Sequence, residues 1–227
     1  MSLDVSPVLA ALPEPDRAVL SERSVRRLLW HGDILFLAGE RSTRVNVLVR
    51  GLMQLSARDG EGRETILGLA VAGDLVGDLP ALDDLPQPLD AVSSGPSEVI
   101  GIDKEALADA LSRHPKACLE LARALVARTR WICDTAMERT SAEVPARLAG
   151  RLLDLADLIG SIDGGAIELD VALPQADLAG IAGMCRESAC KTLRKFRHRG
   201  MVEYRGKKLR ILRPDLLERV RCGARLR

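Results

Sequence analysis

The stretch LPQADLAGIAGMCRESACKTLRKFRHRGMVE, residues 173–203, contains two short segments of apolar periodicity separated by Gly183. Pro174 suits the first turn of a helix that runs to about Ala182, and Gly183 suits a tight turn. A second helix is predicted over 185–199, because Ala189, Leu193 and Phe196 recur at helical spacing, and Gly200 ends it. Two helices joined in this way predict a helix-turn-helix.

The second helix concentrates positive charge. Six Lys or Arg residues follow Cys185 in CRESACKTLRKFRHRG, 185–200, with a single carboxylate, Glu187. The apolar face directs the charged side chains outward; these are Arg186, Glu187, Lys191, Arg194 and Lys195. In a major groove, Arg186 would meet a guanine edge and Glu187 a cytosine amino group. A helix that gripped only phosphate would gain nothing from that carboxylate, so specific reading of duplex DNA is predicted.

The charge of the whole chain is divided between its ends. Residues 1–114 carry 11 Lys and Arg against 18 Asp and Glu, a net charge of −7. Residues 174–213 carry 11 against 3, a net charge of +8, although the total is only +1. This asymmetry is expected when one end meets a polyanion. After Gly200, GMVEYRGKKLRIL predicts a strand, a turn at 205–208 and a strand, which would form a β-hairpin wing.

The N-terminal part has the pattern of an antiparallel β-structure. VNVLVRGLMQLSARDGEGRETILGLAVAGDLVGDL, 45–79, consists of short alternating runs interrupted by glycine, which predicts hairpins of a β-barrel or sandwich. A short helix is expected over 13–24, a loop over the Pro-rich segment 80–90, and a strand from 97 that leads into a helix at Asp103.

A long helix is predicted from Pro115 to about Arg139, since no Gly or Pro interrupts it. Its small and apolar residues recur at three- and four-residue spacing: Cys118, Leu121, Ala122, Leu125, Thr129, Ile132, Cys133 and Ala136. Two interpretations remain open, packing within the chain and a coiled-coil-like dimer seam. A further helix over 146–160 is expected, with Ser141 ahead of it and Pro145 in its first turn, followed by a Gly-Gly turn and one short strand ending at Pro174.

Composition is that of a globular protein with aliphatic cores. Hydrophobic residues make up 47% and aromatic residues 2%, which disfavours stacking platforms for single-stranded nucleic acid. The chain has no apolar run of membrane-spanning length and no signal-peptide pattern, so we expect a cytoplasmic protein without a membrane partner. The five cysteines form no CxxC pair, and neither a disulfide framework nor a zinc site is expected.

The motifs together resemble the CRP/FNR family of transcription regulators over nearly the whole chain. LPQADLAGIAGMCRESACKTLRKFRHRGMVE is similar to the family's helix-turn-helix signature, and VRGLMQLSARDGEGRETILGLAVAGDLVGD to its effector-binding β-roll. The glycines and the aspartate expected at the turns of that β-roll are Gly51, Gly62, Gly73, Asp74 and Gly77. The resemblance implies an α+β fold with an N-terminal β-roll of the cyclic-nucleotide-binding type, a long dimerisation helix and a C-terminal winged helix-turn-helix. The corresponding domains are 1–114, 115–140 and 141–227.

The resemblance also implies roles for individual residues. Arg186, Glu187 and Lys191 match base-reading positions, and Ser188 matches a phosphate-contacting hydroxyl. Further DNA contacts are expected from Arg194, Lys195 and Gln175. The implied partners are duplex DNA, a second copy of the chain, RNA polymerase and an unidentified effector, with the two half-sites of an inverted repeat about one helical turn apart.

The β-roll departs from the family's cyclic-nucleotide pattern. Asp78 stands where those members have Glu, and Gln87 and Pro88 stand where an Arg-Ser pair would bind the cyclic phosphate. The surrounding acidic residues would repel a phosphate, so a signal other than cyclic AMP is expected. The predicted effector pocket comprises Gly77, Asp78, Leu79, Gln87 and Asp90.

Other cofactors and functions are less well supported by the sequence. N-terminal cysteines that could hold an iron-sulfur cluster are missing, because the first cysteine is Cys118. His31 and His114 are candidate haem ligands, although a lone histidine is more often a surface or capping residue. Cys185, at the start of the recognition helix, is a candidate redox-sensitive thiol, while small residues tolerated near a turn are the alternative for it and for Cys190.

We therefore expect a transcription regulator and no enzymatic activity. A small-molecule-binding or enzymatic β-barrel protein with a basic accessory domain is the alternative, but no nucleophile, phosphate-loop or metal motif supports it.

Overall fold

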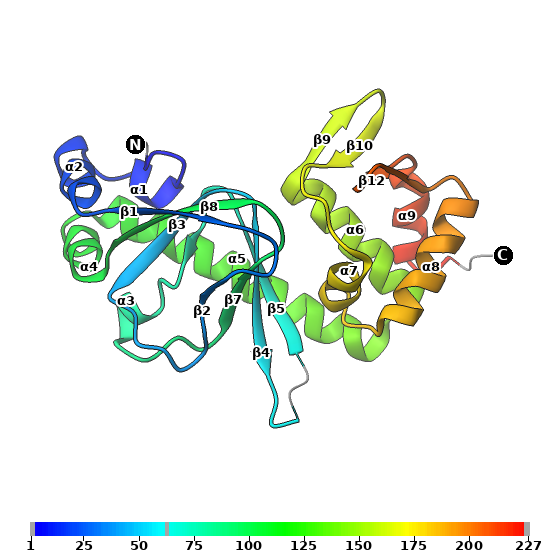
Figure 1. Ribbon diagram of the computed structural model, residues 1–227, viewed down its shortest axis with the longest axis horizontal. Coiled ribbons are helices and arrows are strands. Elements are labelled where there is room, and N and C mark those ends of the chain that lie inside the picture. Colours follow the sequence, from blue (N-terminus) through cyan, green and yellow to red (C-terminus); the bar gives the residue numbers. More distant parts are fainter. Residues whose placement is uncertain (1–2, 62–63, 225–227) are drawn as a thin grey trace. The chain divides into compact units, whose positions relative to one another are not determined.

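The computed structural model describes residues 3–61 and 64–224 and divides into two compact units, Met1–Ile132 and Cys133–Arg227 (Figure 1). We call these the N-terminal unit and the C-terminal unit. The boundary falls inside the long helix, so the expected three-part division at 114 and 140 stays a prediction. Gly62, which was expected at a turn, lies outside the described residues.

The N-terminal unit consists mainly of short antiparallel strands with helices at both ends. Its strands are β1 (Val25–Leu29), β2 (Ile34–Phe36), β3 (Arg44–Arg50), β4 (Leu52–Arg58), β5 (Glu64–Val71), β6 (Leu75–Val76), β7 (Asp90–Ser93) and β8 (Ser97–Asp103). Its helices are α1 (Pro7–Ala10), α2 (Glu14–Glu22), α3 (Pro80–Asp83), α4 (Lys104–Arg113) and the first part of α5 (Pro115–Ser141).

These strands form two four-stranded sheets, with the orders β1-β8-β3-β6 and β2-β7-β4-β5. All the pairings are antiparallel, as in the β4–β5 hairpin, where Leu52 lies opposite Val71. The glycine-punctuated pattern of 45–79 thus folds into the predicted hairpins, and the expected β-roll is confirmed.

In the sheet β1-β8-β3-β6, the strands β8 and β3 are buried on both faces, whereas β1 is largely exposed. Successive side chains of a strand point to opposite faces, so Val99 and Leu48 face the second sheet while Ile100 and Val47 face the helices. Leu107 of α4 and Leu121 of α5 belong to the same buried cluster as Ile100 and Val47. The carboxylate of Asp103 caps α4, because it accepts a hydrogen bond from the Ala106 N–H at 2.9 Å.

The segment expected to be a loop over 80–90 differs from that prediction at its start. Pro80 opens the one-turn helix α3, and Asp84, which ends it, has a left-handed backbone with φ 56°. Proline has no N–H to leave unpaired at the first helical position, so a helix of this length can form where composition alone indicates a loop. The rest of the segment, up to the start of β7, is irregular.

The C-terminal unit contains the helix-turn-helix and its wing. Its elements after α5 are α6 (Val144–Ile159), β9 (Gly160–Asp163), β10 (Ala166–Leu169), α7 (Gln175–Ile181), α8 (Arg186–His198), β11 (Val202–Arg205), β12 (Lys208–Ile211) and α9 (Pro214–Arg221). The four strands form one sheet in the order β11-β12-β10-β9, and α6 packs on α8 and α9. The predicted helices at 174–182 and 185–199 and the hairpin wing are confirmed within one or two residues.

Two details before the helix-turn-helix differ from expectation. Ser141 is the last residue of α5, so it does not cap α6; Glu143 holds the N-cap position and makes no side-chain cap hydrogen bond. The Gly164–Gly165 turn joins two strands, because β9 pairs with β10, and β10 ends at Leu169 instead of continuing to Pro174.

A buried ion-pair cluster joins the end of α5 to α6. The side chain of Arg151 is 4% exposed; it pairs with Glu138, and with Asp154 at 2.6 Å. Burial raises the pKa of Asp154 above its ordinary value, although the positive charges of Arg151 and Arg221 oppose that shift. The cluster fixes the start of the C-terminal unit. Across the described ranges, none of the helices is long and apolar enough to cross a membrane.

Candidate functional site

The recognition helix α8 buries one face and exposes its charges. Ala189, Leu193 and Phe196 are almost completely buried, as their spacing predicted. The opposite side presents Arg186, Glu187, Lys191, Arg194 and Lys195, all of which are exposed. The structure therefore brings together, on one side of a single helix, the candidate groups for reading DNA.

The exposed cations of α8 differ from those of the wing in their pairing. Within the described residues, the side chains of Arg186, Lys191, Arg194 and Lys195 make no hydrogen bond or ion pair. In the wing, by contrast, Arg205 pairs with Asp163 at 3.2 Å and Arg210 with Glu203 at 2.5 Å. The α8 cations are therefore available to an external polyanion.

Arg197 has a structural contact. Its guanidinium lies 5.8 Å from the centre of the Tyr204 ring in β11, a cation–π distance that links the recognition helix to the wing. Nothing in the sequence distinguishes it from the other arginines of α8 except its place on the helix side that faces β11.

The first turn of α8 contains the redox candidate. Cys185 is the N-cap residue and exposed, and its thiol lies 3.1 Å from the Ser188 hydroxyl. Hydrogen bonds from the side chain and the backbone N–H of Ser188 lower the pKa of the Cys185 thiol. The lowering therefore has a more local cause than the neighbouring Arg186 and the helix dipole, which the sequence suggested. Ser188, expected at a phosphate, is half-buried beside this thiol.

Gln175 lies at the start of α7 and connects the two helices. Its amide oxygen accepts a hydrogen bond from the Cys190 thiol of α8 at 2.8 Å. This hydrogen bond links α8 to the start of α7, so Cys190 has a structural role. The turn between the helices depends on Gly183, with φ +60°, where an added Cβ would lie 2.7 Å from the Arg139 Nε.

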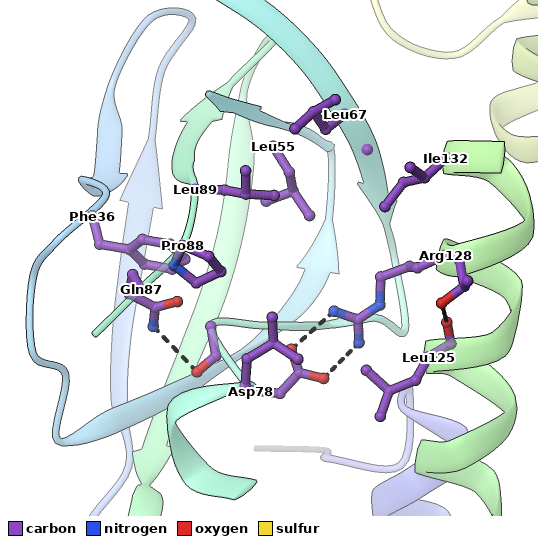
Figure 2. A pocket seen from close by; sticks show the side chains of 14 residues that line it. Phe36, Leu55, Leu67, Asp78, Gln87, Pro88, Leu89, Leu125, Arg128 and Ile132 are labelled. Carbon is purple, nitrogen blue, oxygen red and sulfur yellow. Dashed lines mark hydrogen bonds and ion pairs between the residues drawn. The ribbon is translucent and has the colours of Figure 1, made fainter. Parts of the chain in front are cut away.

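A second candidate site is a cavity of about 160 Å³ in the N-terminal unit (Figure 2). Its wall is mostly aliphatic and aromatic: Phe36, Leu55, Leu67, Leu89, Leu125 and Ile132. The strands and the loop before β7 supply one side, and α5 supplies the other (Figure 2). Gly77, Asp78, Leu79 and Gln87, four of the five predicted pocket residues, line it.

An ion pair lies between the two sides of this cavity. Arg128 of α5 donates two hydrogen bonds to Asp78, at 2.9 Å and 2.5 Å (Figure 2). The side chain of Asp78 is 1% exposed and that of Arg128 is 25% exposed. Burial alone would lower the pKa of Arg128, but the hydrogen bonds and charge of Asp78 outweigh it and raise that pKa.

Gly77 and Gln87 are packed against each other beside this pair. The Gln87 Nε2 donates to the Gly77 carbonyl at 3.3 Å. A Cβ at residue 77, whose φ is +78°, would lie 2.7 Å from that nitrogen and 2.9 Å from the Phe36 ring. Only glycine therefore fits this position without a shift of the cavity wall.

Asp90, the remaining predicted pocket residue, does not line the cavity. Its carboxylate accepts a hydrogen bond from the Ala38 N–H at 2.8 Å and lies 3.3 Å from the Arg58 Nε. Arg128 was not among the predicted pocket residues, because the prediction for α5 rested on apolar periodicity alone. A basic residue that interrupts an apolar helix stripe would have been the signal for it.

The two histidines considered as haem ligands lie apart from this cavity. The His114 Nε2 is 2.9 Å from the Asp16 Oδ2, and His31 is an exposed residue between β1 and β2. No group of three or more His, Cys, Asp or Glu residues with metal-binding geometry occurs among 3–61 and 64–224.

The long helix α5 has two apolar faces. Leu121 and Leu125 pack against the core of the N-terminal unit. A second face is exposed, and its members recur at alternating spacings of three and four: Leu119, Ala122, Val126, Thr129, Cys133 and Ala136. Leu119 is 52% exposed and Val126 is 53% exposed. The predicted stripe thus mixed residues from both faces, and it missed Leu119 and Val126.

Comparisons with known proteins agree with both halves of this architecture. Residues 26–114 match the family model of the cyclic nucleotide-binding domain, and residues 146–220 match that of the Crp-like helix-turn-helix domain. The chain is 29% identical over 188 residues to the CRP-like cAMP-activated global transcriptional regulator of Mycobacterium tuberculosis, covering 83% of this chain and 84% of that one.

Two further similarities extend over most of the chain. The fumarate nitrate reduction regulatory protein of Klebsiella oxytoca is 25% identical over 200 residues, which cover 88% of this chain and 80% of that one. The structure of FixK2 from Bradyrhizobium japonicum has a TM-score of 0.76 at 16% identity, covering 89% of this chain and 99% of that one. The solved structure supports the fold, and the sequence matches support the kind of protein. A β-roll, a long helix and a winged helix-turn-helix with these matches place the chain in the CRP/FNR family of DNA-binding transcription regulators.

Proposed function

We propose that this regulator acts as a homodimer, that it reads an inverted repeat in duplex DNA, and that it responds to a signal other than cyclic AMP. The observation that carries the reading role is the exposed side of α8, where Glu187 lies on the same side of the helix as four cations that have no ion pair with any residue in 3–61 or 64–224. Cations alone would bind any phosphate backbone, whereas a carboxylate is repelled by phosphate and can accept from a cytosine amino group.

Arg186, Glu187 and Lys191 are the proposed base-reading residues. Ser188, Arg194, Lys195 and Gln175 are the proposed backbone contacts. Arg186 and Glu187 occupy the first turn of α8, the part of a recognition helix that enters a major groove most deeply. Lys195 lies further along the helix, where a phosphate is the more accessible group.

The exposed face of α5 supports the homodimer. The alternation of three and four residues from Leu119 to Ala136 is the a/d pattern of a two-stranded coiled coil. Exposure of aliphatic side chains such as Val126 to water is unfavourable. Burial against a second copy would remove this apolar surface from water and so stabilise the dimer. Two reading helices related by a two-fold axis match a palindromic site with half-sites about one helical turn apart.

The chemistry of the cavity supports a signal other than cyclic AMP. The phosphate of a cyclic nucleotide needs a charge-assisted donor, and Gln87 and Pro88 offer none. Arg128 is the one cation that lines the cavity within the described residues, and it is already paired with Asp78. The relative from Mycobacterium tuberculosis is described as cAMP-activated. Under this proposal the two proteins share a fold and respond to different effectors.

The first test is selection of duplexes from a random DNA pool with the purified, reduced full-length protein. Enrichment of a two-fold symmetric site is expected, and enrichment of a single asymmetric half-site would contradict the dimeric reading mode. Binding to the selected site should weaken steeply as salt rises, because each phosphate contact releases counterions. Cyclic AMP at millimolar concentration should leave this affinity unchanged; a tenfold increase would overturn that part of the proposal.

RNA polymerase is the proposed partner at the promoter. Transcription in a purified system from a template carrying the selected site should change when the protein is added. A template with a scrambled site is the control, and equal effects on both templates would contradict a promoter-specific role.

A further inference from the structure

The charges that line the cavity of the N-terminal unit cancel each other. Asp78 and Arg128 form a two-point ion pair, and no other ionisable residue lines the cavity among those described. An anionic ligand that replaced Asp78 on Arg128 would leave without a partner a carboxylate that is 1% exposed. An anion that bound the remaining N–H groups of Arg128 would lie beside that carboxylate and be repelled by it. A cationic ligand would have to displace Arg128 from Asp78, and displacement leaves a buried charge without its partner, so a charged ligand is disfavoured.

The remaining wall of the cavity is apolar. Phe36, Leu55, Leu67, Leu89, Leu125 and Ile132 surround the space, and Figure 2 shows these side chains on both sides of it. A ligand gains from such a wall in proportion to the apolar area that it removes from water. The wall therefore favours a molecule whose surface is mostly carbon and hydrogen.

The Gln87 side chain of the wall can still accept a hydrogen bond. The Nε2 of Gln87 donates to Gly77, while its amide oxygen has no hydrogen-bond donor in 3–61 or 64–224. The hydroxyl of Thr129, another lining residue, donates back to the Leu125 carbonyl at 2.9 Å. The wall thus offers the Gln87 amide oxygen and the lone pairs of the Thr129 hydroxyl as acceptors, which suits a ligand with an N–H or O–H donor.

The volume of the cavity limits the size of the ligand. Its volume is about 160 Å³. A dry apolar cavity of roughly 150 Å³ in another protein binds benzene. A ligand with one aromatic ring, or two small fused rings, is therefore of the right size, whereas a purine, a ribose and a cyclic phosphate together are larger.

We infer that this cavity takes a small, uncharged, mainly aromatic or aliphatic molecule with one hydrogen-bond donor, which contacts both the β-roll and α5. The binding itself is inferred from the residues that line the cavity. Only the regulatory effect of the ligand rests on the proposed function. Leu125 and Ile132 belong to α5, the helix that also presents the exposed face with Val126 and Thr129. A ligand that prefers one position of this helix would shift the population between two states of the regulator.

Titration calorimetry on the full-length protein tests the ligand class with four probes. Indole is neutral and has an N–H donor, indene has nearly the same shape without the donor, and benzoate and cyclic AMP are anions. Saturable binding of indole is expected, with indene several-fold weaker and both anions at least tenfold weaker. Anions that bind as tightly as indole, or no indole binding up to its solubility, would overturn the inference.

Variants locate the binding. Leu67→Trp should fill the cavity and reduce indole affinity at least tenfold, whereas Leu69→Trp makes the same change in the same strand at a residue outside the cavity wall and should leave the affinity unchanged. Gln87→Met should remove the preference for indole over indene. If Leu67→Trp does not fold, Ile132→Trp at the half-exposed end of the wall takes its place. Undiminished indole binding in the filled variants would show that the site lies elsewhere.

DNA selection with the same preparations separates this inference from the proposed function. A protein that binds indole but selects no DNA retains the ligand class and loses the regulatory role. A protein that selects DNA but binds no neutral probe retains the regulatory role and refutes the ligand class.

Discussion

The guanidinium of Arg128 and the carboxylate of Asp78 form two parallel hydrogen bonds between the long helix and the segment before α3, 50 residues apart in the chain. Among the described residues the pair is the one ionic contact of the cavity wall, and Asp78 is 1% exposed. It connects the segment after β6 to the helix that carries the proposed dimer seam.

Loss of Arg128 should be strongly destabilising. Arg128→Met leaves the Asp78 charge buried without a counterion, which costs about 3–5 kcal/mol of unfolding free energy. The double variant with Asp78→Asn should recover a large part of that loss, because no unpaired charge remains. Urea unfolding measures both effects. Arg123→Met on the same helix is the control, since its exposed pair with Glu120 is worth under about 1 kcal/mol; a loss equal to that of Arg128→Met would contradict the argument.

Arg186 and Lys195 should differ in what they contribute to DNA binding. Arg186→Ala is expected to cost about 1–3 kcal/mol on the selected site and to relax specificity at one base pair. Lys195→Ala should weaken selected and random DNA alike and reduce the salt dependence. Fluorescence anisotropy with both DNAs measures these effects, and Arg219→Ala in α9 controls for the loss of one exposed positive charge. Equal losses for Arg186→Ala on both DNAs would remove its reading role.

Val126 should be essential for the proposed dimer and Ala127 should not. Val126→Glu places a carboxylate at an a position of the exposed α5 face, where the two copies would repel each other. Ala127→Glu adds the same charge one residue later, at an exposed position outside this seven-residue pattern. Sedimentation velocity should show a monomer for the first variant and a dimer for the second. A dimer for both would place the interface on another surface.

Modification of the Cys185 thiol should block DNA binding. Its exposed position in the first turn of α8 puts any adduct beside Arg186, and its lowered pKa makes it reactive at a lower pH than an ordinary thiol. Iodoacetamide should abolish binding of the native protein and spare Cys185→Ser, although the exposed Cys118 and Cys222, which lie outside the proposed dimer seam, react in both.

Ser188→Ala tests the cause of this reactivity. Without the hydroxyl, the thiolate loses a hydrogen bond, the pKa of Cys185 should rise, and alkylation at neutral pH should slow. The rate against pH for that thiol, measured by peptide mass spectrometry, gives the pKa directly. An unchanged profile would assign the lowering to the backbone N–H alone.

Asp74 should make stability fall as pH rises. Burial raises the pKa of Asp74 above its ordinary 3.8, although the Val71 N–H and the charge of Arg128 oppose this effect. The folded state then binds the proton more tightly than the unfolded state, so the contribution is complete below pH 3.8 and is lost as pH rises through the folded pKa. Asp74→Asn keeps a side-chain oxygen that can accept from the Val71 N–H. It should gain stability relative to the native protein over that window, by about 1.4 kcal/mol for each pH unit that separates the folded and unfolded pKa values. A stability difference that does not change with pH would refute this assignment.

The helix-turn-helix was predictable because its signals are local. Pro174, Gly183 and Gly200 mark the boundaries, and Ala189, Leu193 and Phe196 define the buried face of α8. The β-roll was predictable as a class from its glycine turns and short alternating runs. Pairing partners such as β1 with β8 are separated by many residues and leave no local pattern.

The parts that were missed depend on distant contacts or on weak periodicity. The pairing of Arg128 with Asp78 is visible only after the fold brings α5 against the segment before α3. The strand β9 carries Ile162 at 86% exposure, so its sequence has no buried face to reveal it. The helix α9 did have a signal in Pro214 and Asp215, which suit the first turn of a helix.

The position of Thr129 would restrict how the proposed ligand specificity could change. The residue lines the cavity and also belongs to the exposed α5 face. A mutation there would therefore affect both ligand binding and the proposed dimerisation. Leu55 and Leu67 line the same cavity from β4 and β5, away from that face. Substitutions that change the ligand specificity, in evolution or in engineering, are therefore less constrained on the strand side. On the helix side they would also have to preserve the proposed dimer seam.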